Sequence, residues 1–296
     1  MDRGLFSILC GFSFCLGACI ASFLNVVIWR VPRGESIVSP PSHCPKCNAL
    51  IKWYRNIPIL SWLALRGKCA NCRAPISPRY ILIELLGGVL FLAVFWCCFM
   101  PYAPYVKDMV QKQIFPFPLA ITLVAMWIWV SLMIVGSMID FDHKLLPDFV
   151  TIGGMILGLL FHGLISIAQF LHDSNIRLFD YSIIQSACGL IFGFGLLWLI
   201  RFLGSKAFKR EAMGLGDVFL MGAVGALFGP VAVLVTLILS SVFGSIVGVT
   251  MVALSKTKFG KFVEIPYGPY ICMGCLAWMF WGPELVNWYL RLMGVR

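Results

Sequence analysis

The chain has 296 residues, of which 60% are hydrophobic and only 12% are charged. A water-soluble domain carries about 25% charged residues, so this composition excludes a soluble globular protein and indicates one that crosses a membrane several times. The formal net charge of +10 would suit a nucleic-acid partner. However, the basic residues cluster in loops between apolar stretches, without the interleaved basic and aromatic pattern of an RNA-binding surface. We therefore expect no nucleic acid as a partner.

The amino-terminal part of the chain predicts two membrane spans separated by a basic loop. Residues 5–29 are apolar over a length that suits a spanning helix rather than a cleaved signal peptide. Residues 30–79 are polar and contain nine Lys or Arg and one Glu, which places this loop in the cytoplasm by the positive-inside rule. Residues 81–100 form the second predicted span, and residues 101–116 a short outer loop.

The rest of the chain contains six further apolar stretches. We expect spans at residues 117–139, 149–171, 182–202, 217–228, 231–254 and 271–290. These make eight spans with both termini outside, an arrangement that leaves 17 Lys or Arg on inner segments and 6 on outer ones. The sixth span has only twelve residues against the roughly 20 needed to cross, so we expect it to borrow flanking residues or to be partly re-entrant under cover of protein. The predicted fold class is an all-α polytopic membrane protein of about eight transmembrane helices.

Four of the twelve cysteines lie together in the basic loop. Cys44 and Cys47, like Cys69 and Cys72, form a Cys-x-x-Cys pair, and 21 residues separate the two pairs. Paired motifs of this kind are typical of a tetrahedral four-thiolate zinc site, which leaves no open position and is structural rather than catalytic. Free or redox-active thiols are the alternative. We interpret the other eight cysteines, including Cys272 and Cys275, as hydrophobic packing residues.

Two acidic segments lie at cytoplasmic ends of predicted spans. One is Gly214-Leu215-Gly216-Asp217, and the other is Ile139-Asp140-Phe141-Asp142-His143. An aspartate in a membrane segment is costly and therefore predicts function, although Asp217 would also suit a helix N-cap. Asp142 is about 200° from Asp140 around a helix, so both cannot face one partner, and Asp140 lies deeper. Asp148 follows Pro147 at the start of an apolar run, which indicates a helix N-cap.

Two carboxylates delivered to the same depth by two helices would form an aspartyl-protease pair. One would accept a proton from water while the other donates a proton to the scissile carbonyl or the leaving group. A proton-coupled transporter is the rival interpretation, but its acids are expected near the midplane rather than at one interface. A non-catalytic membrane scaffold with a zinc loop is a third.

Several segments together resemble the bacterial type IV prepilin peptidases. Residues 21–32 (ASFLNVVIWRVP) resemble the amino-terminal signature of that family, and residues 53–62 (WYRNIPILSW) and 66–69 (RGKC) resemble its cysteine loop. Residues 139–148 and 213–217 are similar to its two aspartate segments. The resemblance covers nearly the whole chain. The glycine–aspartate motif alone would also suit presenilin-like proteases, which lack the four-cysteine loop.

The resemblance implies a bifunctional enzyme of the bacterial inner (cytoplasmic) membrane. Such an enzyme cleaves the basic leader from prepilins and type II secretion pseudopilins after a glycine, on the cytoplasmic side, and then methylates the new N-terminal residue with S-adenosylmethionine. By motif position, Asp140 and Asp217 match the catalytic pair, and Cys44, Cys47, Cys69 and Cys72 match ligands of a structural Zn²⁺. The resemblance also implies two parts: residues 1–80, with the methyltransferase region, and residues 81–296, a transmembrane aspartyl peptidase. The expected partners are prepilin or pseudopilin substrates and membrane lipid.

The sequence departs from the family pattern at three positions. Ala212 replaces a frequent Gly before the Met, Phe219 a frequent Lys after the Asp, and Ile81 a frequent Pro after Arg-Tyr. None of these changes removes a carboxylate. No nucleotide-binding glycine pattern marks a donor site, so methyl transfer follows from the resemblance alone.

Overall fold

The protein is helical throughout the part that the structure describes. This computed structural model describes residues 3–100, 117–172, 181–209, 211, 213–254 and 266–294, so the predicted outer loop at 101–116 lies outside the described residues. Within them there is no β-strand, only two isolated bridges, His43 with Leu50 and Lys68 with Pro75. The predicted all-α fold is confirmed.

Six described helical stretches are long and apolar enough to cross a membrane. They are Gly4–Arg33, Arg79–Phe99, Pro118–His143, Asp148–Ala168, Ser182–Phe208 and Pro230–Met251. The chain is therefore a multi-pass membrane protein. The prediction of eight spans also counted a short helix and the last helix, and it stays a prediction.

The chain divides into two compact units, Met1–Val135 and Gly136–Arg296. The division falls within one helix, α5 (Phe117–His143). The division between Val135 and Gly136 separates two units of packed helices. The boundary predicted at residue 80 separates two proposed functions, so it is not tested by this division and stays a prediction.

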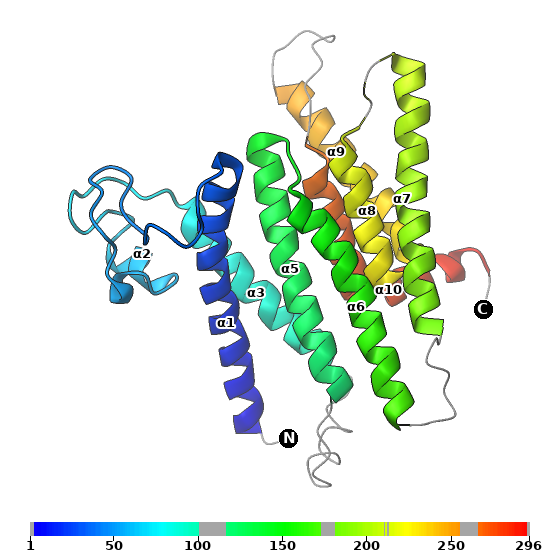
Figure 1. Ribbon diagram of the computed structural model, residues 1–296, viewed down its shortest axis with the longest axis horizontal. Coiled ribbons are helices and arrows are strands. Elements are labelled where there is room, and N and C mark those ends of the chain that lie inside the picture. The colour runs from blue at the N-terminus through cyan, green and yellow to red at the C-terminus, as the bar shows by residue number, and fades with distance from the viewer. Residues whose placement is uncertain are drawn as a thin grey trace. The chain divides into compact units, whose positions relative to one another are not determined.

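The first unit is built on the pairing of α1 (Arg3–Arg30) with α3 (Arg79–Phe99) (Figure 1). The helices approach closely because small residues line the contact: a Cβ at Gly17 would lie 2.6 Å from the Cβ of Phe91. Between them the chain forms two 3-10 turns, η1 (Val31–Arg33) and η2 (Trp53–Arg55), and the short helix α2 (Leu60–Ala64). The first part of α5 completes this unit.

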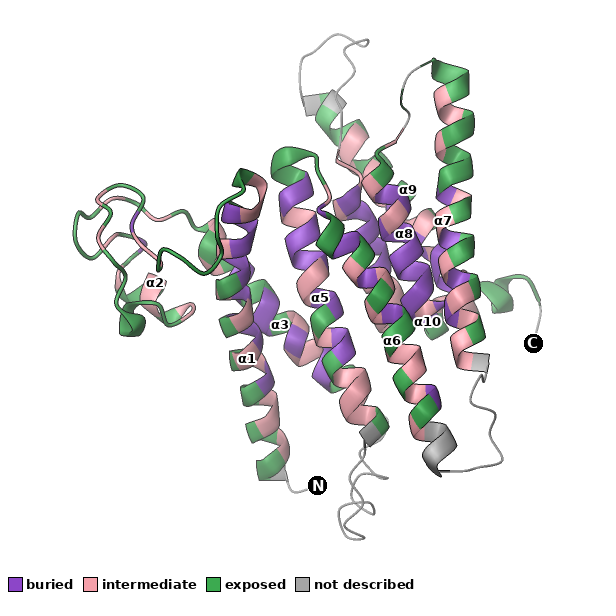
Figure 2. Cartoon of the chain, in the orientation of Figure 1, coloured by how far each residue is buried: buried purple, intermediate pink, exposed green. Residues whose placement is uncertain are grey.

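In the second unit, α8 (Leu215–Phe228) is the central helix (Figure 2). It contacts α6 (Asp148–His172), α7 (Tyr181–Phe208), α9 (Pro230–Leu254) and α10 (Gly268–Leu292). Its 14 residues extend over about 21 Å, less than the roughly 30 Å of a bilayer core. Because neighbouring helices bury ten of its 14 residues, a short helix is tolerated here. The predicted borrowing of flanking residues or re-entrant course of the sixth span stays a prediction.

Side chains from α6 and α7 bind the free carbonyls at the C-terminal end of α8. His162 Nε2 lies 3.0 Å from the carbonyl of Leu227, and the Ser186 hydroxyl donates to the carbonyl of Ala226 at 2.6 Å. The last carbonyls of a helix have no partner within it, so these two bonds allow α8 to end inside the protein.

Candidate active site and metal centre

Asp140 lies near the C-terminal end of α5, on its buried side. The side chain is only 6% exposed, whereas Asp142, two residues further on, is exposed. A step of two residues turns about 200° around a helix, which accounts for the difference. The structure thus points Asp140 into the protein and Asp142 away from it.

Asp217 lies in the first turn of α8 and is 7% exposed. Gly214, with extended backbone, is the N-cap residue, so Asp217 is the third residue of the helix and the N-cap alternative is wrong. Its carboxylate reaches back to the backbone N–H of Gly214, as an acidic third residue does in a capping box. The side chain is therefore fixed by its own helix.

The two aspartates come together although 77 residues separate them (217 − 140). Their carboxylates are near enough for their charges to act on each other. The second oxygen of Asp140 (Oδ2) accepts a hydrogen bond of 2.9 Å from the backbone N–H of Gly268, at the start of α10. Two buried carboxylates, each bound by one backbone N–H, form the candidate active site.

Three further residues adjoin the aspartates, and the sequence did not predict them there. Leu146 fills the space between two glycines, because a Cβ at Gly216 would lie 2.7 Å from the Leu146 Cβ, and one at Gly268 3.3 Å from its Cδ1. Cys272 is buried, is hydrogen-bonded with Ser137, and lies close enough for both aspartate charges to act on it. The sequence signal for Gly268 was its place between Pro266 and Pro269 at a helix start. Nothing in the sequence around Cys272 distinguishes it from a cysteine that only packs within an apolar helix.

Asp148 is exposed and is the first residue of α6. The backbone N–H groups of Val150 and Thr151 bond to the carbonyl of Pro147, so Pro147 is the N-cap residue, and the prediction of Asp148 as the N-cap is wrong by one residue. The structure does not bring this carboxylate into the pair.

The four cysteines of the basic loop form a separate cluster in the first unit. The sulfurs of Cys44, Cys47, Cys69 and Cys72 all lie within 4.8 Å of one another. The sulfurs of Cys44 and Cys72 are 3.8 Å apart. Four sulfurs held about 2.3 Å from a tetrahedral zinc ion would be separated by about 3.8 Å, so the cluster fits a zinc ion.

The two Cys-x-x-Cys turns have the same local backbone. In each, the first cysteine N–H bonds to the carbonyl five residues on: Cys44 to Ala49 at 3.0 Å and Cys69 to Ala74 at 2.8 Å. In each, the residue after the second cysteine has a left-handed backbone conformation, with φ of 54° at Asn48 and 57° at Arg73. This repeated turn points both cysteines of a pair toward one centre.

Hydrogen bonds from the backbone prepare the thiols of this cluster to bind a cation. The N–H groups of Cys72 and Asn71 hydrogen-bond Cys69 and lower its pKa to about 6. The Ala49 N–H and the Asn71 side chain lower the pKa of Cys47 in the same way. Because the thiolate is the form that binds metal, these bonds suit Cys69 and Cys47 as ligands. The Ala74 N–H lowers the pKa of Cys72, but burial and the three neighbouring thiols outweigh it and raise that pKa to about 11, so this thiol needs a cation beside it to ionise at neutral pH.

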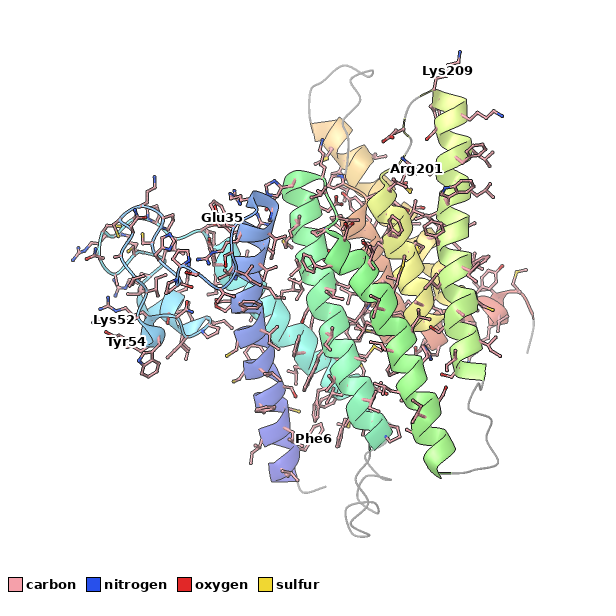
Figure 3. All side chains as sticks on the ribbon, viewed as in Figure 1. Phe6, Glu35, Lys52, Tyr54, Arg201 and Lys209 are labelled. Carbon is pink, nitrogen blue, oxygen red and sulfur yellow. The ribbon has the colours of Figure 1, made fainter. Side chains whose placement is uncertain are left out.

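Glu84 of α3 ties the cysteine loop to the helices of the first unit. Its second carboxylate oxygen (Oε2) accepts a 2.7 Å hydrogen bond from the N–H of Ile59, and the Glu84 side chain is 8% exposed. Ile59 has a φ of 63°, which is costly for a β-branched residue and persists only where surrounding contacts enforce it. The outer part of the loop is exposed, as Lys52 and Tyr54 show in Figure 3.

Arg201 of α7 fixes the segment before α8 (Figure 3). Its side-chain Nε donates to the carbonyl of Met213 at 2.9 Å, and one of its terminal nitrogens lies 3.3 Å from a carboxylate oxygen of Glu211. A cavity of about 280 Å³ lies beside these residues. Phe219, where the family often has Lys, packs against Phe194 of α7 with ring centroids 5.5 Å apart.

Two sequence profiles match separate parts of the chain. The profile described as Bacterial Peptidase A24 N-terminal domain matches residues 15–98, and that of the Type IV leader peptidase family matches residues 127–249. The first match contains the four cysteines and the second contains both aspartates.

Curated relatives match over almost the full chain. A prepilin leader peptidase/N-methyltransferase of Myxococcus xanthus is 37% identical over 95% of this chain and 75% of its own length. Proteins of the same name from Stutzerimonas stutzeri and Legionella pneumophila are each 33% identical, over 93% and 92% of this chain and 92% and 91% of their own lengths. No solved structure matches the chain.

Proposed function

The chain belongs to the type IV leader peptidase family, and from that premise we propose that it removes the basic leader of type IV prepilins and pseudopilins and then methylates the new N-terminus. The relatives are named for both activities. The observation that carries the peptidase proposal is the approach of two buried carboxylates, Asp140 and Asp217, from different helices.

The two carboxylates would act as general base and general acid in hydrolysis of the peptide bond. The ionised carboxylate accepts a proton from water, whose oxygen attacks the scissile carbonyl carbon, while the protonated carboxyl donates its proton to the carbonyl oxygen. As the resulting tetrahedral intermediate collapses, the carbon–nitrogen bond breaks and the amine nitrogen takes a proton from the first carboxyl. The products are a leader ending in a carboxylate and a pilin with a free N-terminal amine.

The predicted topology suits such a substrate. A prepilin has a charged leader in the cytoplasm and an apolar helix in the membrane, so its scissile bond lies at the cytoplasmic interface. We propose that Asp140 and Asp217 act at that interface of the inner membrane, because the basic loops are predicted on the same side.

For the second reaction we propose S-adenosylmethionine as the methyl donor. This donor supplies a methyl group from a sulfonium sulfur to the N-terminal amine. The support is the name of the relatives. We also propose that the zinc-stabilised loop contributes to this activity, because the first profile match covers that loop.

An assay with purified protein in detergent tests the proposal against its rivals. Incubation with a full-length prepilin should yield a product that begins after the leader, and addition of S-adenosylmethionine should increase the mass of that product by one methyl group. A transporter would instead move protons in proteoliposomes, and a scaffold would do neither. Unprocessed prepilin alongside proton movement would overturn the proposal.

A further inference from the structure

The first turn of α10 has one backbone donor available to a partner outside the helix. The first four N–H groups of a helix have no acceptor within it. In α10 the N–H groups of Tyr270 and Ile271 bond to the carbonyl of Tyr267 at 3.1 and 3.2 Å, and Pro269 has no N–H. Among residues 268–271, Gly268 alone directs its N–H to a residue outside this turn.

That donor reaches Asp140, 128 residues away in the chain. The N–H of Gly268 lies 2.9 Å from Asp140 Oδ2, and both residues are buried. Bonds from a backbone N–H to a carboxylate are stronger than neutral ones, and the positive end of the helix dipole adds to the attraction. Asp140 is thus held by α10 as well as by its own helix.

Only a glycine fits at position 268. A Cβ there would lie 2.7 Å from Asp140 Oδ2 and 3.3 Å from Leu146 Cδ1. Asp140 Oδ2 is the nearer of the two atoms, so it is the first to be pushed aside. A larger residue at 268 would therefore displace the carboxylate of Asp140.

Tyr267 anchors this turn to α9. Its hydroxyl lies 2.8 Å from the hydroxyl of Ser240 and 3.3 Å from that of Ser241. Ser240 is fully buried and Tyr267 is half-buried, so the bond is partly shielded from water. Ordering the residue before Gly268 fixes where the Gly268 N–H points.

We propose that Gly268 and Tyr267 are positioning residues of the peptidase: the Ser240–Tyr267 hydrogen bond fixes the start of α10, and the Gly268 N–H holds the Asp140 carboxylate in place beside Asp217. This rests on the proposed function in so far as Asp140 is a reacting group. Gly268 and Tyr267 act through Asp140 and take no part in proton transfer.

The first experiment compares Gly268→Ala with Gly153→Ala. A Cβ at Gly153, on α6, meets nothing within 4 Å, so this variant is a matched control. Displacement of a catalytic group by about 1 Å costs on the order of 10²-fold in rate. We expect Gly268→Ala to lower kcat for prepilin cleavage by this factor with KM unchanged, and Gly153→Ala to retain the wild-type kcat. Thermal unfolding and zinc content should match in the two variants.

A second variant removes the hydrogen bond without adding volume. Replacement of Gly268 by glycolic acid, through semisynthesis, converts the peptide N–H into an ester oxygen. We expect kcat to fall at least tenfold with KM unchanged. In a double-mutant cycle, Tyr267→Phe and Ser240→Ala should each lower kcat. The double variant should have the same kcat as Tyr267→Phe alone, because that substitution already removes the bond to Ser240 together with the contact to Ser241.

The outcomes separate this inference from the proposed function. If Asp140→Asn abolishes cleavage while Gly268→Ala and the ester variant both keep the wild-type kcat, the positioning role is wrong and the peptidase proposal stands. A loss that appears as a raised KM, or one shared by Gly153→Ala, also overturns the positioning role. Retention of cleavage by Asp140→Asn overturns both.

Discussion

At the level of single residues, Asp140 and Asp217 are held by the same kind of interaction. Each carboxylate binds the backbone N–H of a glycine at a helix start, Gly268 for one and Gly214 for the other. Backbone donors do not rotate as side chains do, so both carboxylates are held in place before substrate arrives. The backbone therefore fixes the positions of both carboxylates in the candidate site.

The role of the pair predicts a specific set of substitutions. Asp140→Asn and Asp217→Asn should each lower prepilin cleavage by at least about 10²-fold, because a general acid or base contributes on the order of 10²–10⁴-fold. Asp142→Asn is the matched control, since Asp142 lies on the same helix but is exposed. Conversion of prepilin to mature pilin, followed by gel mobility, measures the effect. Normal conversion by Asp140→Asn together with loss in Asp142→Asn would reverse the assignment.

The sequence predicted the carboxylates but not the backbone groups that hold them. Helical periodicity showed that Asp140 and Asp142 face different ways, and the deeper position of Asp140 in its span favoured it over Asp142. Gly268 could not be assigned in the same way, since Pro266 and Pro269 indicate only that a helix begins there. Its contact with Asp140 depends on the packing of α10, which no local pattern encodes.

At the level of helices, the contact of α7 with α8 sets the position of Asp217. Gly189 of α7 and Gly225 of α8 meet backbone to backbone, and a Cβ on either would clash with the carbonyl oxygen of the other. Small residues allow membrane helices to approach in this way. The sequence predicted a short sixth span, but not that it would be the most buried helix of its unit, because apolar composition is the same for lipid-facing and protein-facing residues.

This close contact predicts a stability difference between two similar substitutions in α7. Gly189→Ala should destabilise the protein by about 1–3 kcal/mol, as overpacking in a core does. Gly195→Ala on the same helix should be neutral or slightly stabilising, because a Cβ there meets nothing within 4 Å. The midpoint of thermal unfolding in detergent distinguishes them. Equal midpoints would show that the two helices are not packed as described.

We propose that the cysteine loop depends on bound metal rather than on a core. It has few buried residues, so zinc would supply much of its folding free energy. Purified protein should contain about one zinc per chain, and Cys44→Ser should lose it. Cys188→Ser is the control, since Cys188 lies on α7 outside the cluster. Metal analysis by mass spectrometry gives the ratio, and a metal-free protein with an unchanged, protease-resistant loop would contradict the zinc assignment.

At the level of the whole molecule, the candidate groups for the two reactions lie in different units. The cysteine cluster belongs to Met1–Val135 and the aspartates to Gly136–Arg296. Each sequence profile also matches one group only. The chemistry differs as well, because methyl transfer needs a deprotonated amine aimed at a sulfonium methyl group, and carboxylates suited to activating water offer no evident help with that step.

These differences predict that the two reactions can be separated. Asp217→Asn should leave methylation of a pre-cleaved pilin peptide within about twofold of wild type, while abolishing cleavage, because the substituted carboxyl serves only proton transfer in hydrolysis. Cys72→Ser should show the reverse order, with methylation weakened more than cleavage. Transfer of labelled methyl from S-adenosylmethionine to the peptide is the measurement. If Asp217→Asn loses both reactions while it stays folded and zinc-loaded, the two-site proposal is wrong. One substitution would then have stopped both reactions without unfolding either unit, so both must use a single shared site.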